Sequence, residues 1–315
     1  MINIGIIGIG GVGGYLGALL SSFYQNSDKV KISLFARGET ADKLKRDGLT
    51  LKSKEIGKTI TTMPNAVYDN CDHSPIMDYM FVCVKSYSVE SIIERVAKTI
   101  DNNTIIIPFQ NGVDGRDKLL KAFPCNRVLD GCVYVMSRIE SCGVVVEDGI
   151  VGRTHFYYGD PEGDNSYLSE LSAILSAAFD HIDIDDNISS RVWTKFSRIS
   201  TLSTLQTYFG ITSGQILEKT IYKEHYVALL LEFIAVAKAL GHYLADDLVD
   251  ISLEYIAVSP YGMTTSMQRD FNDGRSSELE GQCGYISHRA KELGVSTPLY
   301  DKIYFDLKSR QQNNG

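Results

Sequence analysis

The sequence predicts an α/β domain with a doubly wound parallel sheet, followed by an all-helical domain. Short apolar runs alternate with amphipathic helical stretches in the first part of the chain, as a parallel sheet with crossover helices requires. After about residue 187 the strand signals stop and only helical patterns follow. A length of 315 residues also favours two domains over one. We therefore expect a first domain over residues 1–187 and a helical domain over residues 188–315.

The first 27 residues contain no charged side chain, which raises the alternative of a membrane span or a signal peptide. Seven glycines dilute the hydrophobicity of this segment, and no basic residues precede it. A buried strand over residues 2–7 and an apolar helix over residues 15–24, joined by a glycine-rich turn, explain the segment better. We therefore expect no membrane segment here.

The glycines of this turn follow the pattern GxGxxG at Gly8, Gly10 and Gly13. In such a turn the first glycine allows a tight bend, the second lets the backbone approach a pyrophosphate, and the third lets the helix pack closely on the strand. The N-terminus of the helix presents free N–H groups and a positive dipole end to the phosphates. A strand before the pattern and a helix after it predict a dinucleotide-binding domain of the Rossmann type.

The second strand, expected over residues 30–36, ends next to Arg37. NAD-binding domains usually carry an acidic residue at this place, which binds the ribose hydroxyls and repels a 2′-phosphate. A guanidinium group makes charge-assisted contacts to that phosphate instead, so Arg37 favours NADP(H) as the cofactor. The alternative is a solvated surface arginine in a loop.

Two further strands are expected over residues 80–84 and 104–108. Ligands of doubly wound sheets bind outside the carboxyl ends of the strands, so the residues after each strand are candidates for ligand contacts. Lys85 follows the first of these strands, and the segment Gln110-Asn111-Gly112 follows the second.

The later part of the chain predicts additional strands and then helices. Alternation between about residues 130 and 160 indicates antiparallel strands added to the sheet. Residues 181–186 fit an edge strand or a linker, with a cation site at their three aspartates as the alternative. Ser277 and Glu280 fit a capping box. The helical patterns cover residues 192–209, 222–240, 246–259 and 277–293.

Composition and residue spacing exclude several functions. The chain carries 31 Lys and Arg against 39 Asp and Glu, a net charge of −8, so we expect no nucleic-acid partner. The six cysteines form no CxxC pair, and no two of the six histidines stand four residues apart, so we expect no metal site. We interpret the cysteines as the reduced thiols of a cytoplasmic protein.

With these residues placed, the chain resembles the ketopantoate reductases (2-dehydropantoate 2-reductases), in which a Rossmann domain precedes a helical domain. The likeness covers nearly the whole chain, and its motifs follow one another at suitable separations. They are GIGGVGG at the start, FARG with Arg37, VKS with Lys85, QNG with Asn111, WTKF with Lys195, SMQRD with Ser266, ELE with Glu278 and GVSTP near the end.

The resemblance implies an NADP-dependent oxidoreductase that reduces a 2-oxo acid to a 2-hydroxy acid, in the first place 2-dehydropantoate to pantoate in pantothenate biosynthesis. It implies that Lys195 is the general acid and that Glu278 helps to hold substrate hydroxyl groups. It places Ser266 at the substrate carboxylate and Asn111 beside the nicotinamide ribose and the substrate. The remaining implied cofactor contacts are Arg37 and Lys85.

General chemistry agrees with a lysine in this role. Hydride delivery to a C2 carbonyl develops negative charge on the oxygen, which a nearby ammonium group stabilises and then protonates. The alternative for Lys195 is a surface lysine of a helix. The alternatives for Glu278 and Ser266 are an interaction with the helix dipole and a helix cap.

The sequence differs from the family pattern on the helix that carries Lys195. Positions 199 and 203 share its face, because residues four apart on a helix lie on one side. Ketopantoate reductases usually carry Asn at both positions, whereas this chain carries Ile199 and Ser203. Isoleucine offers no hydrogen bond to a substrate hydroxyl group, and Ser203, still a candidate substrate contact, reaches less far. The change favours a less hydroxylated 2-oxo acid.

Three functions therefore stay open. They are a reductase of ketopantoate, a related reductase that acts on another small-molecule 2-oxo acid or forms an opine-type product, and a non-catalytic NADP(H)-binding sensor. The sequence also leaves open whether the apolar helices between residues 222 and 259 bury their faces within the domain or across a homodimer.

Overall fold

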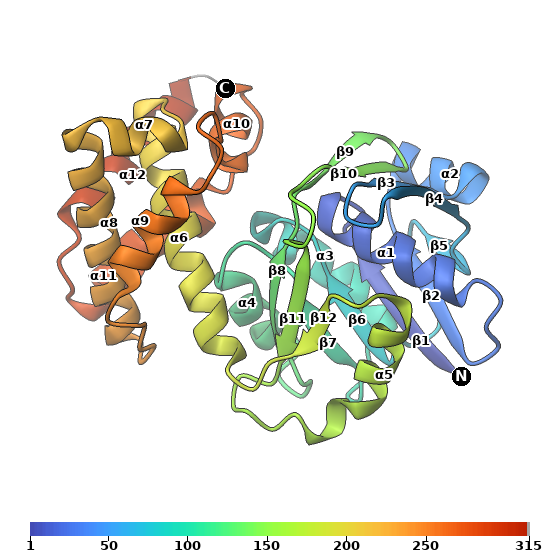
Figure 1. Ribbon diagram of the computed structural model, residues 1–315. Helices are drawn as coiled ribbons and strands as arrows, with labels where there is room; N and C mark the ends of the chain where they lie inside the picture. Colours follow the sequence, from blue (N-terminus) through green and yellow to red (C-terminus); the bar gives the residue numbers. More distant parts are fainter. Residues whose placement is uncertain (314–315) are drawn as a thin grey trace. The chain divides into compact units, whose positions relative to one another are not determined.

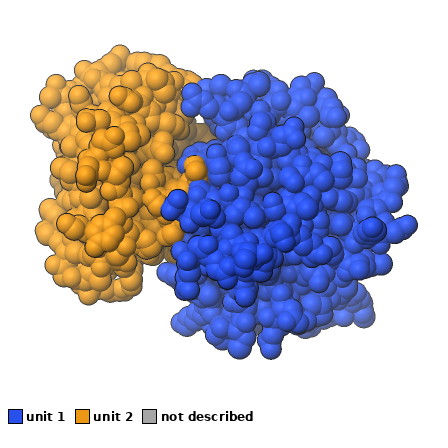
Figure 2. All heavy atoms as spheres, turned by 60° about the horizontal axis from the view of Figure 1, so that its bottom comes forward, with its two compact units in different colours: residues 1–111, 115–188 blue, residues 112–114, 189–315 orange. Residues whose placement is uncertain are grey.

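The structure of the chain is a computed structural model that describes residues 1–313 (Figure 1). It divides into two compact units, coloured separately in Figure 2. The first unit is formed by residues 1–111 and 115–188, and the second by residues 112–114 together with the described chain from residue 189 onward. Each unit has a hydrophobic core of its own.

The first unit is built on a five-stranded parallel sheet, which confirms the doubly wound α/β prediction. The central strand is almost wholly buried, as expected for a run of β-branched residues covered on both faces. The strand order reverses between β1 (Ile2–Ile7) and β6 (Tyr79–Val82), and this switch point is where ligands of such sheets bind. In spatial order the strands are β5 (Ala66–Tyr68), β2 (Val30–Phe35), β1 (Ile2–Ile7), β6 (Tyr79–Val82) and β7 (Ile105–Pro108).

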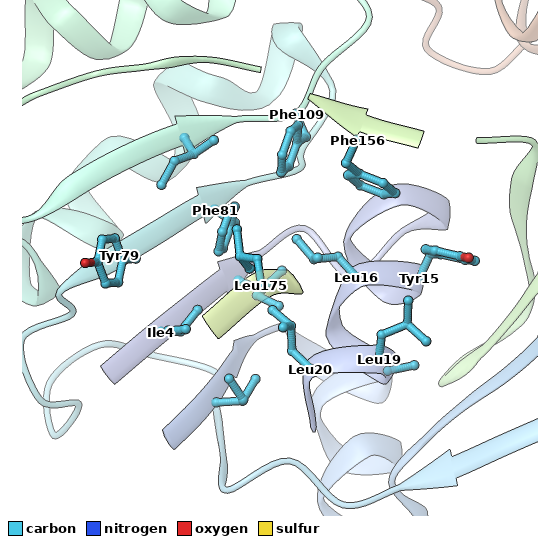
Figure 3. Close-up of a cluster of buried hydrophobic side chains, with 14 of the residues drawn as sticks. Ile4, Tyr15, Leu16, Leu19, Leu20, Tyr79, Phe81, Phe109, Phe156 and Leu175 are labelled. Atoms are coloured by element: carbon cyan, nitrogen blue, oxygen red, sulfur yellow. The ribbon is translucent and has the colours of Figure 1, made fainter. Parts of the chain in front are cut away.

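Helices cover both faces of this sheet. On one face, α1 (Gly11–Tyr24) and α5 (Ser169–Ala178) bury their apolar side chains against β1, β2 and β6. Phe81, Phe109 and Phe156 meet there, and the ring of Phe109 stands edge-on to that of Phe156 (Figure 3). The helical segments of the other crossovers are α2 (Gly38–Asp47), η1 (Ser86–Ser88), α3 (Val89–Val96), η2 (Ala97–Thr99), α4 (Asp114–Ala122) and η3 (Ser166–Leu168).

The additional strands expected between residues 130 and 160 are present, but they form two sheets of their own instead of extending the parallel sheet. An isolated bridge between Ile106 and Val128 joins β7 to the chain that leads into these strands. One ladder pairs β11 (His155–Gly159) with β8 (Asp130–Tyr134) and with the edge strand β12 (Ile182–Ile184). The other has the order β4 (Lys58–Thr62), β3 (Leu49–Ser53), β10 (Val144–Glu147) and β9 (Ser137–Ser141).

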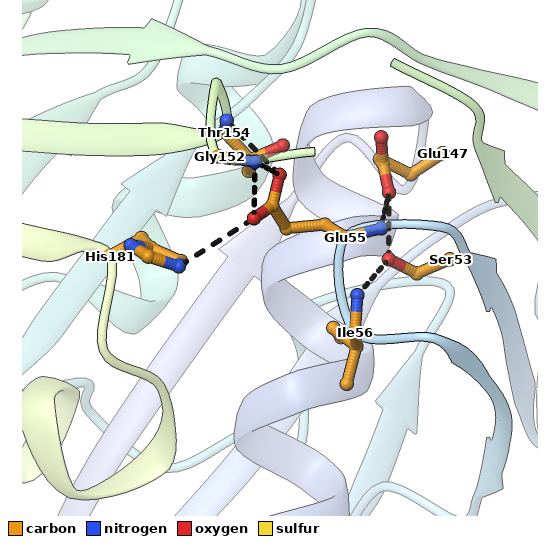
Figure 4. Close-up of polar contacts among 7 residues, drawn as sticks. All are labelled: Ser53, Glu55, Ile56, Glu147, Gly152, Thr154 and His181. Atoms are coloured by element: carbon orange, nitrogen blue, oxygen red, sulfur yellow. Dashed lines mark hydrogen bonds and ion pairs between the residues drawn. The ribbon is translucent and has the colours of Figure 1, made fainter. Parts of the chain in front are cut away.

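Two buried carboxylates connect this four-stranded sheet to neighbouring loops through hydrogen bonds (Figure 4). Glu147 accepts hydrogen bonds from the hydroxyl of Ser53 at 2.7 Å and from the backbone N–H of Glu55 at 2.8 Å. The carboxylate of Glu55 in turn accepts from the backbone N–H groups of Gly152 and Thr154. Burial raises the pKa of Glu55, but these donors outweigh it and hold the pKa below its usual value.

The second unit is helical, as predicted, and the described helices include none long and apolar enough to cross a membrane. Aromatic side chains from different parts of the chain meet in its core: the rings of Phe196 and Phe233 lie 5.4 Å apart, and Trp193 stacks on His242. The helices are α6 (Ile188–Phe209), α7 (Ser213–Glu218), α8 (Thr220–Ala239), α9 (Leu248–Ala257), α10 (Ser266–Asn272), the π-helix η4 (Glu280–Gly284), α11 (Tyr285–Leu293) and α12 (Pro298–Asn313).

The capping box expected at Ser277 and Glu280 is wrong. The helix starts with Leu279 and a π-helical turn, so Glu280 already lies inside it. The Glu280 carboxylate accepts a hydrogen bond from Tyr304 and pairs with Lys308, while the buried Ser277 hydroxyl has no hydrogen-bond partner within residues 1–313. The spacing S-x-x-E is local, whereas the contacts to α12 depend on tertiary packing.

Candidate functional site

The glycine-rich turn between β1 and α1 has the geometry that its sequence pattern predicts. Gly8 has φ +92°, a left-handed conformation that side chains other than glycine rarely adopt, and a Cβ atom there would lie 2.6 Å from the Val84 nitrogen. A Cβ atom on Gly13 would lie 2.2 Å from the carbonyl oxygen of Gly8. Both positions therefore exclude any side chain because strand, turn and helix pack closely.

Gly10 differs from its two neighbours in the motif. Apart from its two chain neighbours, a Cβ atom at Gly10 would have no atom of the described residues within 4 Å, so open space adjoins the backbone at this point. Gly10 is also the N-cap of α1, whose first N–H groups have no partner within the helix. Open space beside a helix N-terminus is where the pyrophosphate of a dinucleotide fits.

Arg37 lies two residues beyond β2, at the carboxyl edge of the sheet. It is exposed and occupies the N-cap position of α2. A second guanidinium reaches the same edge: Arg95 on α3 donates a hydrogen bond of 2.8 Å to the backbone oxygen of Asp69, the residue after β5. Because Tyr68 pairs with Phe35, the ends of β2 and β5 are neighbours. Burial and the nearby positive charge of Arg37 lower the pKa of Arg95.

Lys85 and Asn111 also lie at the carboxyl edge, one after each of two neighbouring strands. Val82 pairs with Pro108 at the ends of β6 and β7, and Lys85 and Asn111 each follow three residues later. Both are half-buried. The side-chain amide of Gln110, which is 8% exposed, donates a hydrogen bond of 2.7 Å to the backbone oxygen of Val84 and so connects the two segments.

In the second unit, α6 carries the expected catalytic lysine on a face rich in small polar residues. Lys195 is 9% exposed, so it is not the solvated surface lysine of the alternative interpretation. Ser203, two turns along the same helix, is buried, and Ile199 between them is partly exposed. The helix thus presents an ammonium group and a hydroxyl group with an apolar side chain between them.

Ser266 is the first residue of α10, and the alternative that it caps this helix is wrong. The cap is Thr265, whose hydroxyl accepts from the backbone N–H of Gln268. Sequence reasoning missed Gln206 on α6, which holds this segment in place through two hydrogen bonds: its oxygen accepts from the Thr265 N–H, and its nitrogen donates to the Met263 oxygen. The same nitrogen also donates to the Ser213 hydroxyl on α7.

Glu278 lies directly before the helix that starts with the π-turn, and it is 3% exposed. The amide of Gln282 donates to its carboxylate at 3.4 Å, and the backbone oxygen of Gln282 accepts from the Ser200 hydroxyl on α6. These bonds tie the Glu278 segment to the helix that carries Lys195. A π-turn inside a helix is frequent at functional sites.

The predicted residues therefore form two groups, one in each unit. In the first unit they gather at the carboxyl edge of the parallel sheet and its glycine-rich turn. In the second they lie on α6 and on the two segments that Gln206 and Ser200 tie to it. The members of the first group are Gly8, Gly10, Gly13, Arg37, Lys85 and Asn111, and those of the second are Lys195, Ser203, Ser266 and Glu278.

Comparison with protein families gives two matches that together cover most of the chain. Residues 4–161 match the family model described as "Ketopantoate reductase PanE/ApbA", and residues 187–311 match its C-terminal counterpart. The chain is 26% identical over 304 residues to "Uncharacterized oxidoreductase YkpB" of Bacillus subtilis, with 96% of this chain and 97% of that protein covered. It is 24% identical to a 2-dehydropantoate 2-reductase of Nostoc sp., with 96% and 93% covered.

Solved structures with the same fold include enzymes of different names. The 2-dehydropantoate 2-reductase from Methylococcus capsulatus superposes with a TM-score of 0.87 at 24% identity, covering 100% of this chain and 98% of that one. A D-mandelate dehydrogenase in complex with NADH and anilino(oxo)acetate superposes with a TM-score of 0.86 at 18% identity, covering 99% of both chains. At such identities the likeness establishes the fold.

Proposed function

Since this chain belongs to the ketopantoate reductase family of oxidoreductases, we propose that it uses NADPH to reduce the C2 carbonyl of a 2-oxo acid, in the first place 2-dehydropantoate. The observation that carries the proposal is the glycine-rich turn. Packing leaves no room for a side chain at Gly8 and Gly13, whereas open space adjoins Gly10. Such a turn at a helix N-terminus suits the pyrophosphate of a nicotinamide dinucleotide. The name 2-dehydropantoate 2-reductase, given to relatives such as that of Nostoc sp., supports the substrate.

The charges at the carboxyl edge support NADPH over NADH. Arg37 occupies the place that a carboxylate takes in NAD-binding domains, and Arg95 adds a second guanidinium at the same edge. Two like charges close together repel each other, and an anion bound between them relieves this repulsion. The 2′-phosphate of NADPH is such an anion, whereas the ribose hydroxyl of NADH carries no charge.

The bound cofactor would supply the hydride, and the protein would supply charge, orientation and a proton. In this proposal Lys195 faces the substrate carbonyl, stabilises the negative charge that develops on its oxygen, and donates a proton to it. The burial of Lys195 supports this role, because an ammonium group withdrawn from water interacts more strongly with a developing anion.

The other residues of the proposed site orient the substrate. Ser266 at the start of α10 would donate to its carboxylate, and Glu278 would accept from its hydroxyl groups. Asn111 would bind between the nicotinamide ribose and the substrate, with Lys85 at the cofactor. Ser203 on α6 would offer its hydroxyl to the far end of the substrate.

A second candidate function rests on Ile199. This partly exposed side chain lies on the face of α6 between Lys195 and Ser203 and offers no hydrogen bond to a substrate hydroxyl group. It favours a 2-oxo acid with an apolar side chain. The D-mandelate dehydrogenase structure shows that the same fold occurs in an enzyme bound to an aromatic oxo acid derivative.

A substrate panel distinguishes these candidates. We expect the purified chain to oxidise NADPH with 2-dehydropantoate, and we would compare 2-oxoisovalerate, phenylglyoxylate and other 2-oxo acids by kcat/KM. A higher kcat/KM for the apolar acids would establish the second candidate. Tight NADPH binding without turnover of any acid would favour the non-catalytic sensor and contradict the reductase.

A further inference from the structure

We propose that Gln110 and Lys118 are positioning residues that fix the backbone on both sides of Lys85 and so place its ammonium group for the cofactor. The inference rests on the proposed function, because it takes Lys85 to contact NADPH. The inference goes beyond the proposed function because it assigns a role to two side chains that do not take part in the reaction themselves.

The backbone that carries Lys85 lies between the end of a strand and a short 3-10 helix, whose residue Ser88 donates its backbone N–H to the Lys85 oxygen at 2.8 Å. Strand β6 ends at Val82, and the last ladder-type bond joins the Cys83 N–H to the oxygen of Ile7. The 3-10 helix η1 starts only at Ser86. The Val84 carbonyl group, which precedes Lys85, is therefore held by a side chain and not by a strand ladder. The Ser86 carbonyl group accepts from the backbone N–H of Val89 and, in addition, from a side chain.

Gln110 holds the first of these carbonyl groups. Its side-chain nitrogen donates to the Val84 oxygen at 2.7 Å, and the residue is 8% exposed, so water competes little for the bond. Because Gln110 directly precedes Asn111, this bond also fixes the Lys85 segment relative to the second segment proposed to bind the cofactor.

Lys118 adds a side-chain hydrogen bond to the second carbonyl group, which also accepts from the backbone N–H of Val89. It lies on α4, its ammonium group donates to the Ser86 oxygen at 3.2 Å, and it lies 3.4 Å from the carboxylate of Glu90 on α3. Gln110 and Lys118 both come from the segment that follows β7, so one neighbouring crossover fixes the Lys85 backbone from both sides.

The Gln110 amide can occupy its position because residue 115 is glycine. A Cβ atom at Gly115 would lie 1.6 Å from the Gln110 side-chain oxygen, and this buried oxygen has no hydrogen-bond partner of its own among the described residues. The amide is therefore held by packing against Gly115 and by its bond to Val84. Gly115→Ala would displace the amide while leaving the chemistry of Gln110 and Lys85 unchanged.

The test measures the dissociation constant of NADPH for the full chain by fluorescence titration, together with the thermal unfolding midpoint. The variants are Gln110→Met, which keeps length and removes the donor, Gly115→Ala, and Lys118→Met. Lys121→Met is the matched control, because Lys121 is an exposed residue of the same helix. Each substitution of a positioning residue should weaken NADPH binding about 3- to 10-fold, the net worth of one hydrogen bond.

A double-mutant cycle with Lys85→Ala separates positioning from a general loss of structure. If Gln110 acts through Lys85, Gln110→Met should weaken binding less than about 2-fold in the Lys85→Ala background. An equal effect in both backgrounds would overturn the inference, as would normal binding by Gln110→Met or Lys85→Ala, or a loss in Lys121→Met as large as in Lys118→Met. A wild-type chain that does not bind NADPH would instead overturn the proposed function, and the inference with it.

Discussion

The side-chain oxygen of Gln206 accepts a hydrogen bond of 2.9 Å from the backbone N–H of Thr265, so that α6 holds the start of the helix that carries Ser266. The other end of the same amide donates to Ser213 and to the Met263 oxygen. One buried side chain on α6 thus sets the position of a proposed substrate contact relative to the helix of the proposed general acid.

Gln206→Leu should therefore weaken both stability and substrate binding. It removes three hydrogen bonds and leaves the Thr265 N–H and the Ser213 hydroxyl without the partner that Gln206 supplies, whereas the Met263 oxygen keeps the backbone N–H of Ser213. We expect a loss of about 2 to 4 kcal/mol in the free energy of unfolding. In the folded fraction, KM for the oxo acid should rise more than kcat falls, because α10 moves and Lys195 does not. Urea unfolding and steady-state kinetics check this. Gln206→Glu keeps the acceptor for Thr265, so a KM as high as that of the leucine variant would contradict the role given to this bond.

Lys195→Met should remove turnover and spare the cofactor. We expect kcat to fall by about 10²- to 10⁴-fold, the usual contribution of a general acid. The dissociation constant of NADPH should stay within about 2-fold, because the cofactor contacts lie in the first unit. Lys302→Met, at an exposed position of α12, is the control. Parallel losses of kcat and NADPH affinity in Lys195→Met would refute the catalytic assignment.

Arg37 and Arg95 at the carboxyl edge of the sheet should determine the preference for NADPH over NADH. Arg37→Ala should weaken NADPH binding by about 1.5 to 3 kcal/mol and change NADH binding little, because only NADPH carries the 2′-phosphate. Arg95→Ala should act in the same direction. Arg46→Ala is the control, since Arg46 lies in the last turn of the same helix α2 and pairs with Asp47. If NADH and NADPH weaken equally, Arg37 does not bind the 2′-phosphate.

Stability should depend on pH through Asp130. Burial raises the pKa of Asp130 to about 6 in the folded chain, against the opposing effect of Arg116, whose side chain lies 3.5 Å away. The usual pKa of the group is 3.8, so between pH 4 and 6 the folded state keeps a proton that the unfolded state has released. The contribution of Asp130 to stability therefore falls as pH rises through this window and is constant above it.

Comparison with Asp130→Asn isolates this effect from the other carboxylates. The stability of the variant relative to wild type should rise by about 2 kcal/mol between pH 4 and pH 6.5. Arg116→Met should move the window to higher pH, because it removes the opposing charge. Urea unfolding at several pH values measures the difference, and a difference that stays constant with pH would disprove the raised pKa.

The parts of this fold that sequence reasoning predicted are those in which the information is local. The strand over residues 2–7, the turn at Gly8 to Gly13 and the long helix through Lys195 each follow from periodicity or from a short motif. The pairing of β10 with β3 could not be predicted in this way, because its partners lie about 90 residues apart and either strand alone fits several sheets.

The same distinction applies to the candidate site. Glycine, arginine and lysine positions could be found from motifs, but Gln110, Gln206 and Arg95 act on backbone groups far away in sequence. A glutamine in a helix or after a strand carries no local signal of such a bond. The capping box failed for the same reason, since Glu280 interacts with α12 and not with its own helix start.

Gly10 and Gly13 allow folding and cofactor binding to be separated within one motif. Gly10→Ala meets no protein atom within 4 Å, and the φ of −94° at this position suits alanine, so the unfolding midpoint should stay unchanged. The added methyl group occupies the space of the pyrophosphate, and NADPH binding should weaken more than about 10-fold. Gly13→Ala should instead lower the midpoint, because its Cβ would lie 2.2 Å from the oxygen of Gly8. Gly262→Ala, which also meets no atom, is the control. Unchanged NADPH affinity in Gly10→Ala would show that the turn does not hold the dinucleotide, and the cofactor proposal would lose its main support.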